Sequence, residues 1–265
     1  MPANAETSTD TISLPKKVLF FFATIYFYIV VLGLAIPTAL TVMAVIFPLF
    51  WYPPAKRWTH AVACNWGRLS MLLMRVVGLG RVRYQGFEKL KGFQGVILAN
   101  HQSQIDILAM LGSFANFRWV SKASMFKIPL IGWAMYLTGY IGLVRGEAAS
   151  IKKMVQDCKY CVEQGNSVLL FPEGTRTTTG KLLPFKVGGF SIAKKVNAPI
   201  ALITIEGSWA SLPPKQFLMR KRLDVTITVR EVLRPEDFAD WNSKELMRQV
   251  EAKFHQWLEP GSSEA

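Results

Sequence analysis

Cysteine, histidine and acidic side chains are all scarce in this chain of 265 residues, which has three cysteines and three histidines. So few cysteines favour a reducing compartment. Cys158 and Cys161 form a CxxC pair, which could be redox-active or half of a zinc site. No second pair exists to complete that site, and Cys158 shares one helical face with Ile151, Met154, Val155 and Val162. We therefore expect both to be structural.

The shortage of acidic residues leaves the chain strongly basic. Eighteen Asp and Glu stand against 31 Lys and Arg, which gives a net charge of +13. Such an excess indicates an anionic partner: nucleic acid, a phosphorylated ligand or an anionic membrane surface. Nucleic-acid binding would require aromatic residues interleaved with a basic face, whereas the aromatic residues here concentrate in one apolar segment. We expect no nucleic-acid partner, and the basic run at residues 220–222 suits anionic headgroups.

Charge is absent altogether from residues 18–52, and the mean hydropathy of the chain is +0.23. An apolar run this long predicts a membrane segment. It is too long to be the apolar core of a cleaved signal peptide. Cations flank both ends, so the positive-inside tendency places both ends at the cytoplasmic interface. Gly33 and Pro37 lie near the middle. We expect a helical hairpin embedded in the membrane and bent at these two residues, in preference to a single tilted span.

After this segment, strand-like runs alternate with helical patterns. The strand-like runs are residues 81–86, 95–99, 117–121, 140–144, 167–171, 200–207 and 223–231. Helical patterns cover residues 58–80, 104–114, 129–137, 148–163, 186–196 and 243–258. This alternation predicts an α/β fold, with a mixed, largely parallel sheet covered by helices. We divide the chain into residues 1–57, an N-terminal tail with the membrane hairpin, and residues 58–265, the α/β domain.

His101 directly follows the buried strand predicted at residues 95–99. Ligands gather beyond the carboxyl ends of strands in such sheets. Ser103 and Asp106 have the spacing of a capping box at the start of the next helix, and that first turn can bring the Asp106 carboxylate back to the imidazole. One ring nitrogen would then be fixed and the other left free to take a proton. The alternative is a capped helix beside a surface histidine.

A second polar cluster, PEGTRTTTGK at residues 172–181, follows the strand predicted at residues 167–171. Glu173 and Arg176 flank a Gly174–Thr175 turn, and a guanidinium there suits a phosphate or carboxylate. The alternative is a polar loop with an internal Glu–Arg pair.

Two further strand ends carry cations. Arg145 follows the strand predicted at residues 140–144, and the alternative for it is a solvated charge. Lys122 and Lys127 lie on a nearby loop and add positive potential.

Two of these clusters resemble the motifs of a known family. NHQSQID (100–106) matches the NHxxxxD motif, and FPEGTR (171–176) contains the EGTR motif, of the glycerolipid acyltransferases. GYIGLVR (139–145) and APIALITIEG (198–207) resemble the second and fourth blocks of that family. The resemblance covers about residues 80–210 and is strongest to the 1-acyl-sn-glycerol-3-phosphate (lysophosphatidic acid) acyltransferases. An N-terminal two-helix membrane motif is also known in bacterial members.

The resemblance implies that the chain transfers an acyl group to the sn-2 hydroxyl of lysophosphatidic acid to give phosphatidic acid. His101 would act as general base and Asp106 would orient it. The donor would be a thioester, either acyl-CoA or acyl carrier protein, and attack would occur in one step without a cofactor or metal. No GxSxG elbow is present to form an acyl-enzyme. The implied acceptor site comprises Glu173, Gly174, Thr175 and Arg176, with Arg145 and Lys122 as further candidates.

Several alternatives remain open at this point. The acceptor could be another lysolipid, such as a lyso-ornithine lipid or a lysophospholipid, and a hydrolase acting with water would need the same base. A membrane protein that binds anionic lipid without catalysis would also account for the charge. In each case we expect a lipid bilayer as partner and the α/β domain on the cytoplasmic face, at the inner membrane if the source is bacterial.

Overall fold

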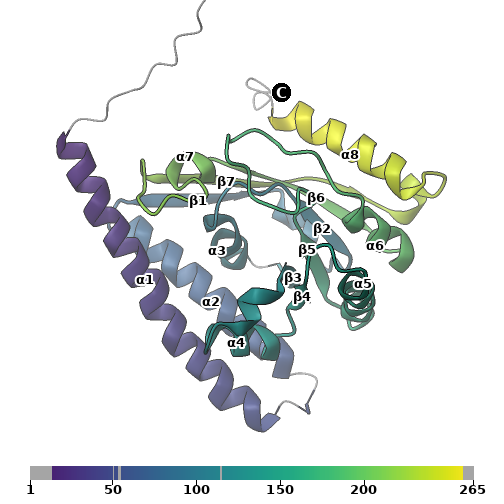
Figure 1. The fold of residues 1–265 in the computed structure, drawn as a ribbon, viewed down its shortest axis with the longest axis horizontal. Helices are drawn as coiled ribbons and strands as arrows, with labels where there is room; N and C mark the ends of the chain where they lie inside the picture. Colours follow the sequence, from purple (N-terminus) through teal and green to yellow (C-terminus); the bar gives the residue numbers. More distant parts are fainter. Residues whose placement is uncertain (1–13, 50, 53–54, 114, 259–265) are drawn as a thin grey trace, which may run out of the picture.

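A seven-stranded sheet runs through the computed structural model, which describes residues 14–49, 51–52, 55–113 and 115–258 (Figure 1). Its strands are β1 (Gly80–Gln85), β2 (Val96–Ala99), β3 (Phe117–Lys122), β4 (Ile141–Leu143), β5 (Ser167–Leu170), β6 (Ile200–Glu206) and β7 (Leu223–Leu233). Their order is β1-β7-β6-β2-β5-β3-β4. Every pairing is parallel except that of β6 with β7. The predicted mixed, largely parallel sheet is confirmed.

Helices cover both faces of this sheet (Figure 1). One layer is formed by α1 (Leu14–Ile46), α2 (Ala55–Val76), α3 (Ile105–Gly112) and α4 (Ile131–Leu137). The other is formed by α5 (Ala148–Glu163), α6 (Gly188–Val196) and α8 (Ser243–Leu258). Short elements join them: α7 (Ser208–Ser211) and the 3₁₀ turns η1 (Phe47–Leu49), η2 (Phe87–Leu90), η3 (Ala123–Lys127) and η4 (Pro235–Phe238).

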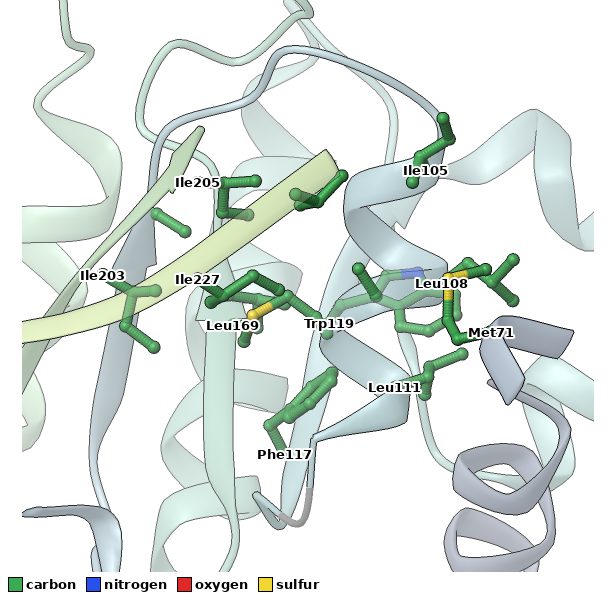
Figure 2. Close-up of a cluster of buried hydrophobic side chains, with 14 of the residues drawn as sticks. Met71, Ile105, Leu108, Leu111, Phe117, Trp119, Leu169, Ile203, Ile205 and Ile227 are labelled. Carbon is green, nitrogen blue, oxygen red and sulfur yellow. The ribbon is translucent and has the colours of Figure 1, made fainter. Parts of the chain in front are cut away.

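The central strands form because both of their faces are buried. Successive side chains of a strand point to opposite faces, so Ile97 and Ala99 of β2 enter the core under α3, whereas Val96 and Leu98 enter the core under α6. Figure 2 shows the first of these cores. Its labelled side chains come from α2, α3 and the sheet: Met71, Ile105, Leu108, Leu111, Phe117, Trp119, Leu169, Ile203, Ile205 and Ile227.

The strand-like runs and helical patterns of the sequence each coincide with an observed element. The structural interpretation of the CxxC pair agrees with the structure, because Cys158 and Cys161 are buried on the inner face of α5 and form no disulfide with each other. The short α7 and the 3₁₀ turns were not anticipated.

The position of the predicted hairpin bend is wrong. α1 continues as one helix of 33 residues through Gly33 and Pro37. A two-helix hairpin is present, but its second arm is the amphipathic α2, which packs beside α1 (Figure 1). The connection between the arms follows Ile46 instead of dividing the apolar run, and α2 begins at Ala55. The flanking cations Lys56 and Arg57 have side chains outside the described residues.

Pro37 lies inside α1 without ending the helix. Proline lacks the N–H that would bond the carbonyl of Gly33, and its ring crowds that position in most helices. Beyond the proline, Thr41 Oγ1 donates to the Pro37 carbonyl at 2.8 Å. The side chains of Ala35 and Ala39, beside this turn, are buried.

The two faces of α1 have different surroundings. Ala23, Phe27, Val30 and Val42 are buried against the rest of the chain, and Trp66 Nε1 of α2 donates to the Val31 carbonyl at 3.0 Å. The opposite face exposes apolar side chains: Leu14, Val18, Phe21, Phe22, Ile25, Ile29, Leu32, Ile36 and Leu40. By length and composition, residues Leu14–Ala44 could cross a membrane. A helix with a domain packed along it, however, cannot be surrounded by lipid on every side.

Candidate active site at the carboxyl end of β2

The parallel strands β2, β5, β3 and β4 end at the same edge of the sheet. The residues singled out in the sequence follow these ends: His101 after β2, Glu173 and Arg176 after β5, Lys122 at the end of β3, and Arg145 after β4. The strand order places β5 next to β2 and leaves β4 at the sheet margin. The site is therefore centred where the loops after β2 and β5 meet.

Asn100 fixes the position at which the chain leaves β2. Its side chain is 1% exposed. The Nδ2 group donates to the carbonyl of Ile205 at 2.8 Å, and Oδ1 accepts from the N–H of the same residue at 2.7 Å. The amide thus continues the pairing of β2 with β6 for one more residue. As a result, His101 leaves the sheet from a rigid point.

His101 and Asp106 form the predicted pair. His101 Nδ1 lies 2.8 Å from Asp106 Oδ2, and Asp106 is completely buried at the start of α3. A carboxylate only accepts, so Nδ1 carries the proton and the lone pair of the neutral ring lies on Nε2. Among the residues that the structure describes, Nε2 has no hydrogen-bond partner, and the His101 side chain is 16% exposed. The ring can therefore accept a proton from a molecule outside the chain.

The capping-box prediction is half right. Asp106 Oδ2 accepts from the backbone N–H groups of Gln102 at 2.6 Å and Ser103 at 2.8 Å, as the acidic member of a capping box does. Ser103 Oγ, however, does not bond the N–H of Asp106. It accepts from Ile105 at 3.3 Å and donates to the Leu212 carbonyl at 2.6 Å. The capping carboxylate is the same group that orients the imidazole.

Phe171 packs against one face of the imidazole. Its ring stacks on that of His101 with centroids 3.9 Å apart and planes inclined by 15°. Phe171 follows β5 and begins the FPEGTR motif. The stacking and the Asp106 bond together leave the ring one orientation, with Nε2 turned away from the carboxylate.

Glu173 lies in an unexpected place. Its side chain is 2% exposed, and Oε1 accepts from the N–H of His101 at 2.6 Å while Oε2 accepts from the N–H of Leu183 at 2.8 Å. The N–H of Thr177 donates to the His101 carbonyl at 3.0 Å. The loop after β5 therefore bonds both the N–H and the carbonyl of His101, and Glu173 faces the NHQSQID segment instead of solvent.

The environment of Glu173 perturbs its ionisation. Burial raises the pKa of this carboxyl to about 7; the N–H groups of His101 and Leu183 oppose the rise, and the charge of Asp106 adds to it. A carboxyl whose pKa is higher in the folded chain than in the unfolded chain stabilises the fold most when protonated. That contribution is present below the ordinary glutamate pKa and is lost as pH rises through about 7.

We therefore expect Glu173→Gln to change the pH dependence of unfolding. Glutamine stays neutral, so the midpoint temperature of the wild type should fall relative to that of the variant as pH rises from 5 to 8. Thermal unfolding of both proteins at several pH values measures this difference. Glu88→Gln, at an exposed position, is the matched control. If the difference in midpoint temperature between wild type and Glu173→Gln does not change with pH, the raised pKa of Glu173 would be refuted.

The rest of the loop after β5 is built around a left-handed glycine. Gly174 has φ of +68°, and its N–H donates to the Phe171 carbonyl at 2.9 Å. Thr175 is exposed and Arg176 half-buried. No Glu173–Arg176 ion pair occurs between these described residues. Because Arg176 precedes Thr177, whose N–H bonds the His101 carbonyl, the backbone of Arg176 lies close to that of His101.

Lys186 was missed in the sequence. Its side-chain atoms lie 2.9–3.2 Å from where a Cβ on Gly174 would be, and its N–H donates to the Pro172 carbonyl at 2.8 Å. The signal available was its place just before α6, where a helix N-terminus favours anions. It adds a second cation to the loop after β5.

Lys122 and Arg145 are both exposed, but they lie further from His101. At about 4.8 Å between neighbouring strands, the end of β3 is about 10 Å and the end of β4 about 14 Å from that of β2. The strand order therefore leaves Arg145 at the margin of the sheet, whereas Arg176 and Lys186 belong to the segment after β5, the neighbour of β2. Within the described residues no three His, Cys, Asp or Glu side chains are grouped to hold a metal ion.

Two residues between His101 and Asp106 contact parts of the chain that the sequence analysis did not place near this motif. Gln104 Nε2 donates to the Tyr28 hydroxyl of α1 at 2.8 Å, and Ser103 contacts Leu212 as described. α1 and the segment after α7 therefore border the candidate active site. Nothing in the local sequence signals these contacts, because the partners are 76 and 109 positions away.

Comparison with known proteins is consistent with this geometry. A 1-acyl-sn-glycerol-3-phosphate acyltransferase of Chlamydomonas reinhardtii is 39% identical over 145 residues, which are 55% of this chain and 44% of that protein. A chloroplastic one of Arabidopsis thaliana is 33% identical over 192 residues, 71% of this chain and 52% of that protein. This chain spans about half the length of these relatives. One of Pseudomonas aeruginosa is 28% identical over 198 residues, 74% of this chain and 75% of that protein.

A solved structure shares the fold. The crystal structure of the 1-acyl-sn-glycerophosphate (LPA) acyltransferase of Thermotoga maritima superposes with a TM-score of 0.75, covering 90% of this chain and 94% of that chain at 24% identity. Residues 81–206 match the acyltransferase family, and this range holds His101, Asp106 and the whole loop from Phe171 to Thr177. Through this domain, the chain belongs to the acyltransferase family.

Proposed function

We propose that this chain is a membrane-bound 1-acyl-sn-glycerol-3-phosphate O-acyltransferase. The observation that carries the proposal is the His101–Asp106 pair, with a 2.8 Å bond on Nδ1 and a free Nε2, beside the loop that holds Arg176. A base and a cation on adjacent loops suit an acceptor that has both a hydroxyl and a phosphate. The names of the curated relatives support the choice of lysophosphatidic acid.

The chemistry needs only these groups and a thioester. His101 Nε2 removes the proton of the sn-2 hydroxyl as the oxygen attacks the thioester carbonyl, and the buried Asp106 carboxylate stabilises the imidazolium. The C–S bond breaks as the ester C–O bond forms. The leaving thiolate then takes the proton from the imidazolium, which restores the neutral ring. The donor is acyl-CoA or acyl carrier protein, and neither requires an acyl-enzyme.

The exposed face of α1 provides contact with the bilayer. Its apolar side chains lie on the side opposite the domain, and Lys16 and Lys17 are exposed at its start. Because Tyr28 of this helix bonds Gln104, an acceptor lipid in the bilayer lies close to His101. The positive-inside tendency favours the cytoplasmic face for the domain.

An acyl-transfer assay tests the proposal directly. Purified protein is supplied with labelled acyl-CoA or acyl carrier protein and a panel of lysolipids: lysophosphatidic acid, lysophosphatidylcholine and lyso-ornithine lipid. We expect phosphatidic acid to form from the first acceptor alone. Transfer to another lysolipid would change the acceptor and retain the mechanism. Release of free fatty acid alone would indicate a hydrolase.

We expect Arg176→Ala to raise KM for lysophosphatidic acid about 10- to 100-fold with a smaller effect on kcat. A charged hydrogen bond is worth about 1.5–3 kcal/mol, which corresponds to this range. Steady-state kinetics on lysophosphatidic acid measures the change, and Arg248→Ala on the exposed side of α8 is the matched control. If KM is unchanged in Arg176→Ala but raised in Arg145→Ala, the phosphate binds nearer the sheet margin.

A further inference from the structure

A loop outside the catalytic motifs combines exposed apolar and cationic side chains. It connects α7 to β7 and comprises residues 212–222, here termed the 212–222 loop. Phe217 is 63% exposed and Leu218 46% exposed. The loop also carries four exposed cations and no acidic residue: Lys215, Arg220, Lys221 and Arg222. Exposed aromatic and aliphatic side chains surrounded by cations are typical of surfaces that bind anionic membranes.

The loop is held against α1 at its apolar end. The rings of Tyr28 and Phe217 stack with centroids 4.4 Å apart and planes inclined by 8°. The N–H of Met219 donates to Thr24 Oγ1 at 2.8 Å, and the Met219 side chain is buried. In Figure 1 the connection from α7 to β7 lies beside α1. Phe217 and Leu218 are therefore held in place by α1 although their own surfaces face outward.

The exposed faces of the loop and the helix form one surface. Residues three and four positions apart are neighbours on a helix surface, so Phe21, Ile25 and Leu32 border the half-buried Tyr28, where the packed face of α1 meets its exposed face. All three are exposed. The apolar surface of α1 thus continues onto Phe217 and Leu218.

The cations of the loop are available to an anionic partner. The first acidic residue after the loop is Asp224, which pairs with Arg81 at 3.3 Å and Arg83 at 2.7 Å. The Arg220 guanidinium lies over the Trp209 ring at 5.7 Å and bonds Gln216, both neutral partners. The positive charge of the loop is therefore not neutralised by the acidic group next to it.

The other end of the loop is attached to the catalytic motif. Ser103 Oγ donates to the Leu212 carbonyl at 2.6 Å, and the N–H of Arg220 donates to the Ser211 carbonyl at 2.9 Å. The loop is thus connected at its start to the residue two positions after His101 and in its middle to α1. A lipid surface bound by the loop would be kept at a fixed distance from the imidazole.

We propose that the 212–222 loop docks on the anionic headgroup surface of a bilayer, with Phe217 and Leu218 inserted among the lipids and the four cations at the headgroups. This rests on the proposed function, since it sets the height of the candidate active site above a membrane. An acidic carrier protein could also meet the cations. It would not require apolar residues continuous with the lipid-facing side of α1, and this continuity favours the bilayer.

Site-specific probes on the full chain test the insertion. Leu218→Cys is labelled with an environment-sensitive fluorophore, since the three native cysteines are buried. Ile29→Cys on α1 and Tyr160→Cys on α5 are labelled in the same way. On vesicles of phosphatidylcholine with phosphatidylglycerol, we expect the emission at positions 218 and 29 to shift to the blue and resist quenching by iodide. Position 160 should remain accessible.

The probes separate two kinds of failure. An accessible position 218 with a protected position 29 would overturn the docking of the loop and leave the membrane association of α1 intact. If position 29 were also accessible, the membrane-bound part of the proposed function would fail as well.

Neutralising part of the loop tests the electrostatic contribution. Lys221→Gln with Arg222→Gln should weaken partitioning onto phosphatidylglycerol-containing vesicles by roughly fivefold per cation and leave phosphatidylcholine vesicles unaffected. Lys152→Gln with Lys195→Gln, exposed on α5 and α6, is the matched control. The proposal would be overturned if the Lys221→Gln, Arg222→Gln variant partitioned onto vesicles as the wild type does. If the same variant had a raised KM for acyl carrier protein, but not for acyl-CoA, the loop would be assigned to the carrier protein.

Discussion

Replacing His101 with alanine is expected to lower kcat about 10²- to 10⁴-fold, the usual contribution of a general base. The loss should appear in kcat because, in the proposed mechanism, Nε2 acts on the hydroxyl during the reaction and contributes little to binding of the ground state. The substitution removes a ring that stacks on Phe171 but leaves the backbone bonds to Glu173 and Thr177 in place. We therefore expect the variant to fold and to bind vesicles as the wild type does.

Acyl-transfer kinetics on purified protein, with circular dichroism and vesicle flotation, measure this result. His255→Ala is the matched control, because His255 is exposed on α8, in the helix layer on the other side of the sheet. Activity above one tenth of wild type in a folded His101→Ala protein would exclude this histidine as the base.

Asp106→Asn is expected to lower kcat by a similar factor of about 10²–10⁴ while preserving the fold. All three donors to Asp106 converge on Oδ2, and the buried Oδ1 has no hydrogen-bond partner within the described part of the chain. An asparagine can therefore place its oxygen at Oδ2 and its NH₂ group at Oδ1 without opposing a donor. The hydrogen bonds remain, but the negative charge that stabilises the imidazolium is lost.

Comparison with alanine distinguishes charge from structure. Asp106→Ala leaves the N–H groups of Gln102 and Ser103 without their acceptor, and each such loss costs about 1–3 kcal/mol. We expect a clearly lower unfolding temperature for alanine than for asparagine, with both variants nearly inactive. Asp240→Asn, at an exposed position, controls for loss of charge. Near-normal kcat in Asp106→Asn would show that the carboxylate serves only to cap α3.

The sheet was predictable because its interior strands are buried on both faces. Burial of this kind requires continuous apolar runs, such as VILA in β2 and SVLL in β5, and polar or glycine-containing segments end each run. The His101–Asp106 pair was predictable for a related reason. Both residues lie within one loop and one helical turn, so their spacing alone determines whether they can meet.

The role of Glu173 could not be predicted because its partners are backbone amides far away in the chain. The N–H of His101 is 72 positions away, and every residue except proline has such a group. Local sequence showed only a carboxylate three positions from Arg176, which suggested a pair that the structure does not form. Lys186 was missed for the same reason, since only the fold of the loop brings it to Gly174.

The course of α1 was mispredicted because nearly every side chain in residues 18–52 is apolar. A helix with one apolar face reveals which side packs inward, whereas a uniformly apolar helix does not. Glycine and proline were the remaining signals, and both favoured a bend. The small side chains Ala23, Ala35 and Ala39 mark the packed face, but their significance depends on knowing that α2 lies against it.

The packed face of α1 also limits how this protein can change over evolution. Thr24, Tyr28 and Val31 supply hydrogen-bonding groups to Met219, Gln104 and Trp66, which belong to three separate parts of the chain. An unrelated helix could not replace α1 simply by being equally apolar, because it would have to supply the hydroxyls of Thr24 and Tyr28 at the same heights along the helix. The apolar helix α1 and the candidate active site must therefore be inherited together, as one unit.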